Sequence, residues 1–363
     1  MLPVSLHEVE FRHRSGFTLS GVTLEFEPST HTAIVGTGGS GISTLLGLIT
    51  GELTPQRGEV RIGDRTVNGV RQSKRPLLHV TDQLDVPGRW AVDHALVAAL
   101  RDRSLDRTDR QREFELAAVK WQLTDLLRRR VDSLSSSERG QLSLACIELI
   151  RPAILVADRL LAPLSPALRS RLADELFRTL RVIGTTVISA PSDHAELAYS
   201  DRVVLLDRGE VIQVGTAAEV WTRPIDDRAA EATGVVNAIP VTIRGTTVES
   251  PIGIWEVSEP PFQGTGLALL RPGDFAVARP GEESDFVFSI EEAGFSSGRW
   301  IARGYLSGGV TLRVELPPEL AIRKGRPLPL RFEPSRVTFI ARALEMPQLS
   351  VPTDVIPLMR DSR

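Results

Sequence analysis

The architecture of this chain follows from one glycine-rich segment, Gly36-Thr37-Gly38-Gly39-Ser40-Gly41-Ile42-Ser43-Thr44. An apolar run at residues 32–35 precedes it and predicts a short buried strand. Another apolar run, at residues 45–49, follows it and predicts the first turns of a helix. Glycines in such a connection turn backbone N–H groups toward one point, and the helix N-terminus adds the positive end of its dipole. The segment is therefore typical of a loop that binds phosphate.

The same segment matches most of the P-loop pattern G-x-x-x-x-G-K-[ST]. Gly36 and Gly41 take the two glycine positions, Ser43 takes the hydroxyl position, and Ile42 takes the lysine position. A glycine-rich turn alone is weak evidence for a ligand. The flanking strand and helix make descent from a phosphate-binding loop the favoured interpretation, and whether the loop still works is a separate question.

Length and composition indicate an ordinary globular protein with room for two domains. The chain has 363 residues, of which 42% are hydrophobic and 25% charged. Its net charge of −3 gives no electrostatic support to a general nucleic-acid or membrane-surface role, so we expect no nucleic-acid partner. Cys146 is the only cysteine, which excludes an internal disulfide and a cysteine-based metal cluster.

The sequence favours a cytoplasmic location. Residues 1–10 lack the basic-then-apolar pattern of a secretory signal. The uncharged span at residues 28–51 is long enough for a membrane helix, but its glycine, serine and threonine content argues against one.

The order of strands and helices predicts an α/β first domain. Residues 4–27 alternate apolar and polar positions, as in an antiparallel β region. Residues 92–130 have a charged helical pattern, which favours a solvated helical subdomain over a partner-binding one. Strands and helices then alternate, which implies a mostly parallel sheet covered on both faces: helix 136–150, strand 153–157, helix 166–182 and strand 185–188.

A second domain begins near Asn237, where short alternating strands separated by glycine and proline replace the helical patterns. This composition predicts a small all-β barrel or sandwich. The predicted division is a first domain at 1–235, with its helical subdomain at about 84–135, a β domain at 236–345, and a proline-rich tail at 346–363.

Taken in order, these segments resemble the ATP-binding subunit of an ABC transporter, of the importer group that carries a C-terminal TOBE domain. Leu134, Ser135, Ser136, Ser137 and Glu138 stand where that family has its LSGGQ signature. Residues 153–158 resemble the Walker B strand, and residues 270–274 (LRPGD) resemble an early TOBE strand. The order and spacing of these motifs are more specific than any one of them.

The resemblance implies a P-loop ABC ATPase domain of α/β class, with a mixed sheet, an antiparallel β subdomain and a helical subdomain, followed by a small all-β TOBE/OB-like barrel. It implies a nucleotide-binding subunit of an importer complex, at the inner face of the cell membrane. The implied partners are membrane-spanning permease subunits and a second ATP-binding subunit, in a homodimer or a heterodimer. The implied cofactors are ATP and Mg²⁺.

Carried over position by position, the resemblance assigns a set of binding residues. The metal positions are Ser43 and Asp158. The nucleotide-binding positions are His13, in place of an aromatic that stacks on adenine, and Gly36, Gly38, Gly39, Ser40, Gly41, Ser43 and Thr44.

The departures from the family pattern fall on the residues that would cleave ATP. The replaced positions are the loop lysine (Ile42), the Q-loop glutamine (Asp82, with Gln83 one residue out of register), the glutamate after Walker B (Arg159), the D-loop aspartate (Ser165) and the switch histidine (Pro191, with His194 three residues away). Losing a lysine–phosphate contact weakens binding by roughly 1.5–3 kcal/mol. Losing the general base costs about 10²–10⁴-fold in rate. We therefore expect weak ATP binding with little or no hydrolysis.

Two of the replaced positions, Asp82 and Arg159, carry opposite charges beside the expected γ-phosphate position. They could form an ion pair that fills the site, or Arg159 could supply the cation that Ile42 lacks. A third interpretation is that the two charges are solvated and never meet. A separation above about 6 Å would exclude the ion pair, since salt bridges require about 4 Å or less.

Three functions fit the sequence. The first is an importer subunit that binds ATP, and the second is a non-catalytic scaffold or regulator acting through protein contacts of the ABC fold and the TOBE domain. The third, weaker one is a sensor whose TOBE-like domain binds a small oxyanion. The sequence shows only one basic cluster there, at residues 323–326, which is more typical of a solvated turn.

Overall fold

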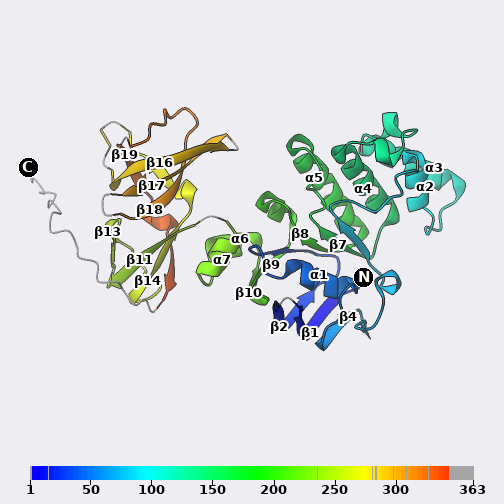
Figure 1. Cartoon of the computed structure of the whole chain (residues 1–363), viewed down its shortest axis with the longest axis horizontal. Helices are drawn as coiled ribbons and strands as arrows, with labels where there is room; N and C mark the ends of the chain where they lie inside the picture. Colours follow the sequence, from blue (N-terminus) through cyan, green and yellow to red (C-terminus); the bar gives the residue numbers. More distant parts are fainter. Residues whose placement is uncertain are drawn as a thin grey trace, which may run out of the picture. The chain divides into compact units, whose positions relative to one another are not determined.

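The computed structural model describes residues 2–14, 16–234, 236–279, 281–282, 284–296, 298–306, 309–325 and 327–342. The chain divides into two compact units, Met1–Thr222 and Arg223–Arg363 (Figure 1). The predicted tail at 346–363 lies outside the described residues, as does Arg326 of the basic turn. Within the described part of the chain, no helix is both long and apolar enough to cross a membrane.

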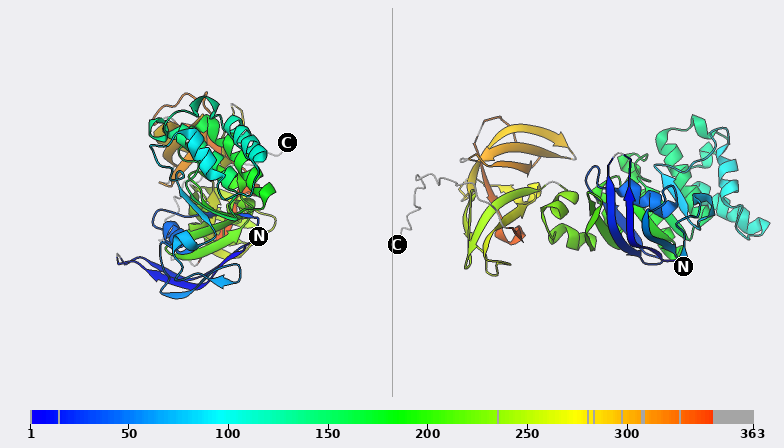
Figure 2. Two further views of the ribbon diagram at one scale, coloured as in Figure 1. Left: turned by 90° about the vertical axis from the view of Figure 1, so that its right-hand side faces the viewer. Right: turned by 60° about the horizontal axis from the view of Figure 1, so that its bottom comes forward.

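An antiparallel sheet opens the first unit, as the alternating pattern predicted. Its strand order is β2-β1-β4-β5. Figure 2 shows β1 and β2 in dark blue. The strands are β1 (Val4–Arg12), β2 (Thr18–Phe26), β4 (Arg57–Ile62) and β5 (Arg65–Thr66). Their inward residues, such as Leu6 and Val60, are fully buried.

The main sheet of the first unit has the order β10-β9-β3-β8-β7-β6 and is parallel except for β10. Its strands are β3 (His31–Val35), β6 (Leu78–Thr81), β7 (Ile154–Asp158), β8 (Thr186–Ala190), β9 (Arg202–Asp207) and β10 (Glu210–Gly215). Every residue of β3 is buried, as its apolar run predicted. The mostly parallel sheet is therefore confirmed.

Both faces of the main sheet are covered, which explains why its strands are apolar on both sides. Along β7, Ile154 and Val156 pack in the core shared with α1 (Ile42–Thr50) and the antiparallel sheet. The intervening Leu155 and Ala157 pack in the core shared with α4 (Ser136–Ile150) and α5 (Pro166–Ile183). Figure 1 shows α4 and α5 on the side of the sheet opposite α1.

The charged region at 92–130 is helical, as predicted, but it is divided. It contains α2 (Val92–Ala99), α3 (Arg107–Lys120) and a 3₁₀ turn at Thr124–Leu126. Asp106 caps α3 by accepting a hydrogen bond from the backbone N–H of Asp109. Trp121, which follows α3, is fully buried and donates its indole N–H to Glu148 at 2.5 Å, which fixes these helices against α4.

The second unit consists of two five-stranded sheets around one apolar core. The sheet orders are β13-β12-β11-β14-β20 and β15-β19-β16-β17-β18. The strands are β11 (Asn237–Arg244), β12 (Thr247–Ser250), β13 (Gly253–Glu256), β14 (Gly264–Leu270), β15 (Phe275–Val277), β16 (Phe286–Ser296), β17 (Arg299–Leu306), β18 (Thr311–Leu316), β19 (Pro327–Phe332) and β20 (Thr338–Ala341). This confirms the all-β prediction and is consistent with a TOBE-like domain.

The two compact units divide after Thr222, and the domain boundary at residue 235 stays a prediction. The first unit ends with α6 (Ala217–Thr222), and α7 (Asp227–Ala232) belongs to the second. The reason is packing, because the buried Ala230 of α7 lies in one apolar cluster with Leu267 and Leu269 of β14. The alanines of this short polar helix do not form an apolar pattern from which its packing on β14 could be predicted.

Candidate nucleotide-binding site

The glycine-rich segment connects β3 to α1 in a tight loop whose backbone is held from both sides. The N–H of Ser40 donates to the carbonyl of Thr37 at 3.0 Å, and the N–H of Gly209 donates to the carbonyl of Ser40 at 2.8 Å. The hydroxyl of Thr37 donates to Asp207 at 3.2 Å. The turn after β9 therefore supports the loop from outside.

Two glycines of the loop are required by the packing around them. A Cβ on Gly36 would lie 2.1 Å from the carbonyl oxygen of Leu206. A Cβ on Gly41, which has φ of 105°, would lie 2.6 Å from the ring of Phe17. Gly39 has φ of 82°, a conformation that favours glycine. In contrast, a Cβ on Gly38 would meet no atom of the described residues within 4 Å.

The first turn of α1 faces the loop with the composition of an anion site. Among the described residues no side chain caps it and none of its first-turn residues is acidic. The N–H groups at a helix N-terminus lack partners within the helix and carry a partial positive charge. Together with the loop amides, they form a cradle for phosphate.

A pocket of about 480 Å³ opens over this cradle. It is lined by loop and helix residues, by aromatic residues at one end, and by strand-end residues at the other: Thr37, Gly39, Ser40, Gly41, Ile42, Ser43, Thr44, His13, Phe17, Asp158, Arg159, Ala190 and Pro191. Of the residues expected to bind nucleotide, Gly36 and Gly38 lie in the loop but are not among the described residues that line the pocket.

His13 marks the aromatic end of the pocket. Its Nε2 lies 3.1 Å from the hydroxyl of Thr44, and its ring meets Phe11 edge-on with centroids 4.8 Å apart. The side chain is half-buried. A planar ring held in this way can stack on a base, which is the role that the sequence assigned to it.

Two charged residues line the pocket at the ends of the strands, Asp158 at the end of β7 and Arg159 directly after it. A third, Asp82, follows β6 and lies beside Arg159 but is not among the described residues that line the pocket. The Nε of Arg159 lies 3.4 Å from Oδ1 of Asp82, so the two charges meet in an ion pair, the first of the three interpretations. Both side chains remain about half exposed, at 62% and 49%. That Arg159 also binds phosphate stays a prediction.

Asp158 is suited to hold a cation. Burial raises the pKa of its carboxyl above the usual value, the nearby charge of Asp82 raises it further, and Arg159 opposes both effects. A divalent cation beside this carboxylate would stabilise its charged form. The hydroxyl of Ser43 lines the same pocket, and hydroxyl and carboxylate oxygens are ligands that Mg²⁺ prefers. Ser43 and Asp158 therefore fit the metal that the resemblance implies.

Three of the replaced positions differ in where the structure places them. Ile42 and Pro191 line the pocket and present only hydrocarbon to it. Ser165 instead stands at the N-cap position of α5, without a capping hydrogen bond from its side chain to a described residue, and it does not line the pocket. Of the described residues that lie near in sequence, neither Gln83 nor the exposed His194 lines the pocket.

The signature-like residues form a separate feature at the start of α4. Ser135 accepts a hydrogen bond from the N–H of Glu138, and the carboxylate of Glu138 accepts one from the N–H of Ser135. The hydroxyl of Ser137 accepts a long hydrogen bond, 3.5 Å, from the N–H of Ser165. Among the described pocket-lining residues there is none of Leu134, Ser135, Ser136, Ser137 or Glu138, so one chain alone does not bring loop and signature together.

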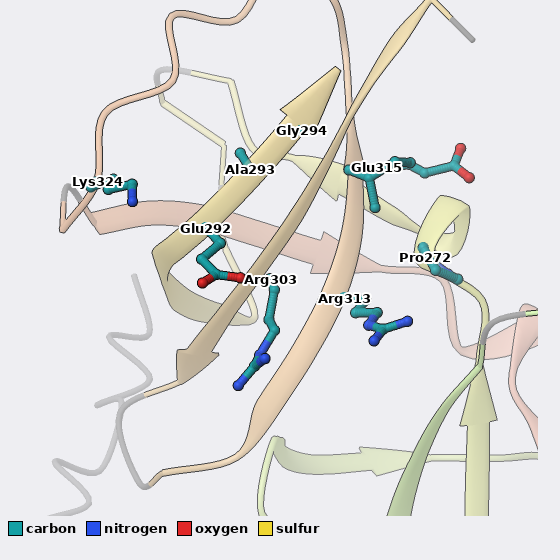
Figure 3. Close-up of a pocket in the computed structure, with 9 residues that line it drawn as sticks. Pro272, Glu292, Ala293, Gly294, Arg303, Arg313, Glu315 and Lys324 are labelled. Atoms are coloured by element: carbon teal, nitrogen blue, oxygen red, sulfur yellow. The ribbon is translucent and has the colours of Figure 1, made fainter. Parts of the chain in front are cut away.

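The second unit holds a pocket of its own, of about 700 Å³, on the face of β16, β17 and β18 (Figure 3). Arg303 and Arg313 are directly paired across β17 and β18, and Lys324 lines the same pocket. Glu292 and Glu315 also contribute. The sequence interpretation recognised only the cluster at 323–326, because these arginines come together through strand pairing rather than through sequence.

Comparisons with known proteins agree with this architecture. The family described as "ABC transporter" matches residues 19–161. A protein of Streptomyces avermitilis, "Fe(3+) ions import ATP-binding protein FbpC", is 32% identical over 277 residues, which cover 76% of this chain and 80% of that one. The "sn-glycerol-3-phosphate import ATP-binding protein UgpC" of Cereibacter sphaeroides is 26% identical over 328 residues, 89% of this chain and 93% of that one.

Solved structures show the same fold for the first part of the chain. The structure of an ATP-binding subunit of an ABC transporter superposes with a TM-score of 0.53 at 19% identity, over 60% of this chain and 91% of that one. A dimeric ATP-binding cassette bound to ADP and Pi superposes with a TM-score of 0.52 at 20% identity, over 59% and 98%. Because the protein of Streptomyces avermitilis is 32% identical over 76% of this chain, the chain belongs to the ATP-binding subunits of ABC importers.

Proposed function

We propose that this importer subunit binds Mg·ATP weakly and cleaves it slowly or not at all. The observation that carries the proposal is the composition of one end of the pocket. Ile42, Arg159 and Pro191 line it together, where the family resemblance implies a lysine, a glutamate and a histidine.

Cleavage of the terminal phosphate requires a group that orients or deprotonates water and donors that stabilise the developing charge. Among the described residues that line the pocket, Asp158 is the only carboxylate, and it is the one suited to Mg²⁺. Ile42 and Pro191 have no side-chain donor or acceptor. Losing a base and one preorganised donor lowers a rate by about 10²–10⁴-fold and 10²–10³-fold respectively, with effects that do not simply multiply.

Binding needs less than cleavage does. The loop amides and the start of α1 supply hydrogen-bond donors, and His13 supplies a ring at the other end. Ser43 and Asp158 would hold Mg²⁺, which offsets phosphate charge when bound. Without the lysine we expect affinity to fall by about 10–100-fold, since one charge-assisted contact contributes roughly 1.5–3 kcal/mol.

The subunit acts in a complex in this proposal. Its loop and signature-like residues lie apart, as they must if each nucleotide is held between two ATP-binding subunits. Membrane-spanning permease subunits are the other partners. Exposed apolar residues on the helical subdomain, Val97 of α2 and Leu116 and Val119 of α3, are suited to protein contact. The proposed location is the inner face of the cell membrane.

The test is steady-state phosphate release with Mg·ATP, by the chain alone and with an intact partner subunit. We expect release at the level of a protein-free blank. A triple variant, Ile42→Lys, Arg159→Glu and Pro191→His, restores the replaced groups and should raise the rate at least about 10²-fold. Adding Asp158→Ala to this triple variant should abolish the gain. Phosphate release by the unaltered chain that Asp158→Ala removes would contradict the proposal.

A non-catalytic scaffold or regulator is the alternative, and nucleotide affinity separates the two. The apolar helical surface fits both functions and therefore does not discriminate between them. A calorimetric titration with Mg·ATP that shows no binding at millimolar nucleotide would favour the scaffold.

One observation favours a second function, binding of a small oxyanion by the second unit. Like charges directly opposite on neighbouring strands repel, yet Arg303 and Arg313 are paired in this way. Arg303 is paired with Glu291, with its Nε 3.7 Å from the Oε2, whereas the side chain of Arg313 forms no ion pair with a described residue. An oxyanion between the two guanidinium groups would relieve the remaining repulsion. Sulfate or phosphate should then raise the melting temperature, less so in Arg313→Gln. Arg299→Gln, on β17 but outside the pocket lining, is the matched control.

A further inference from the structure

The charged end of the loop pocket is held in place by the sheet, not by the loop. The N–H of Asp82 donates to the carbonyl of Asp158 at 2.7 Å, which extends the pairing of β6 with β7 by one residue. The N–H of Arg159 donates to the carbonyl of Ala190 at 2.8 Å, which extends the pairing of β7 with β8. The two side chains therefore start from fixed points on neighbouring strands.

Both residues adopt a backbone conformation that side chains other than glycine rarely take. Asp82 has φ of 53° and Arg159 has φ of 55°. This conformation is unfavourable for residues other than glycine, and aspartate tolerates it better than arginine does. This conformation lets the backbone turn away from the sheet after β6 and after β7, while the two side chains still meet at 3.4 Å. The ion pair thus joins two backbone positions that the sheet holds beside the pocket.

The charges at this end do not cancel. Two carboxylates, of Asp82 and Asp158, lie near the single guanidinium of Arg159, and Glu52 adds a further negative charge that acts on Asp158. Negative charge is therefore in excess before any ligand enters. Mg²⁺ beside Asp158 would offset this excess, but Asp82 would still compete for Arg159 with any phosphate that reaches the end.

The order in which the parts of a nucleotide meet these groups follows from the family resemblance, which places the base on His13 and the γ-phosphate beside Asp82 and Arg159. His13 lies within hydrogen-bond distance of Thr44 on α1, and both His13 and Arg159 line the pocket. A base on His13 leaves the first phosphates over the loop and α1. Only the phosphate farthest from the base extends toward Arg159 and Asp82.

We propose that the Asp82–Arg159 ion pair limits the number of phosphates that the pocket accepts, so that the site prefers a nucleoside diphosphate to a triphosphate with the same base. The proposal rests on nucleotide binding by this pocket, as proposed above. A diphosphate uses the loop and α1 and leaves the ion pair closed. A triphosphate must either displace Asp82 from Arg159 or place its last phosphate next to a carboxylate.

The test is calorimetry of Mg·ADP and of a non-hydrolysable Mg·ATP analogue with the full chain. The unaltered chain should bind Mg·ADP more tightly. Asp82→Asn keeps the shape of the side chain but frees Arg159, so affinity for the triphosphate analogue should rise about tenfold, the effect of about 1.4 kcal/mol. Affinity for Mg·ADP should change by less than about twofold, within ordinary surface effects.

Asp132→Asn is the matched control, because Asp132 pairs with Arg130 and has a similar exposure, 48% against 49% for Asp82. It should change neither affinity. In an Arg159→Gln background, Asp82→Asn should raise triphosphate affinity less than it does in the unaltered chain, because the freed cation is gone.

Two results would overturn the inference. Asp82→Asn could lower affinity for the triphosphate, which would mean that Asp82 holds Arg159 ready for phosphate. It could also raise both affinities equally, which would mean that it acts only through net charge. If the unaltered chain and Asp82→Asn both bind neither nucleotide while Asp132→Asn melts normally, nucleotide binding itself is wrong and this inference fails with it.

Discussion

The two ends of the loop pocket differ in how well their residues match the family pattern. At the end formed by β3, the loop and α1, the glycines, Ser43 and Thr44 match the family pattern. At the end formed by the termini of β6, β7 and β8, Asp82, Arg159 and Pro191 depart from it. The first end is not wholly unchanged, since Ile42 at the start of α1 also departs from the pattern. Because different elements build the two ends, substitutions can test binding and cleavage separately.

The glycines of the loop are explained by packing as well as by ligand binding. Gly36 and Gly41 have no room for a side chain because Leu206 and Phe17 lie against them. These glycines would be needed for folding even without a ligand. Information about function therefore comes from the strand ends, where Arg159 and Pro191 depart from the family pattern.

Among substitutions that test the packing of the loop, we expect the largest loss of stability at Gly36. Gly36→Ala forces a Cβ to within 2.1 Å of the Leu206 carbonyl, so the loop or β9 must shift. We expect a loss of about 3 kcal/mol or more in the free energy of unfolding, from overpacking, and loss of nucleotide binding. Chemical denaturation and calorimetry measure both.

Gly38→Ala is the control for this prediction, because the new Cβ would meet no described atom within 4 Å. Its stability should stay within about 0.5 kcal/mol of the unaltered chain. Equal losses at the two positions would show that the loop is not held by packing as described.

A second effect concerns the strand beneath the cradle. His31 at the start of β3 is buried, and burial lowers the pKa of its imidazole from 6.5 to about 4. Its Nδ1 donates to the carbonyl of Tyr199 at 2.9 Å, and its Nε2 lies 2.7 Å from the hydroxyl of Ser189. The folded state thus holds the neutral ring.

The unfolded chain binds a proton at His31 from about pH 6.5 downward, and the folded chain only near pH 4. Stability is therefore complete above pH 6.5 and falls as the pH drops to 4, by up to about 3 kcal/mol for a shift of this size. Urea denaturation at a series of pH values measures it. A His31→Gln variant should show less loss across this window, and an unchanged slope in that variant would assign the loss to other groups.

The smallest effect is expected at His13, at the aromatic end. His13→Ala should weaken nucleotide binding by about 1 kcal/mol, the lower range for stacking on a base, whereas His13→Phe should keep it. Both should leave the melting temperature within a few degrees, because the side chain is only half-buried. Equal affinity in all three proteins would place the base elsewhere.

Much of the fold could be predicted because its signals are local. The apolar run of β3, the glycines of the loop and the helix that begins at Ser136 all lie in continuous segments. The Asp82–Arg159 pair was within reach as well, because both positions follow strands that the family resemblance placed side by side.

What the sequence did not reveal depends on packing between distant segments. Arg303 and Arg313 meet because β17 and β18 pair in a particular register, which a pattern of residues does not state. Similarly, α7 joins the second unit through a few buried alanines, among the least informative residues in a sequence. Ser137 lies beside Ser165 only because α4 and α5 pack together.

The central claim is that this subunit binds ATP without consuming it. Equilibrium dialysis of the full chain against Mg·ATP, with the nucleotide in both chambers identified by chromatography at the end, tests binding and cleavage in one measurement. We predict that nucleotide is enriched in the protein chamber and that it is still ATP. Conversion to ADP that is abolished by Asp158→Ala, or equal nucleotide in both chambers, would contradict the claim.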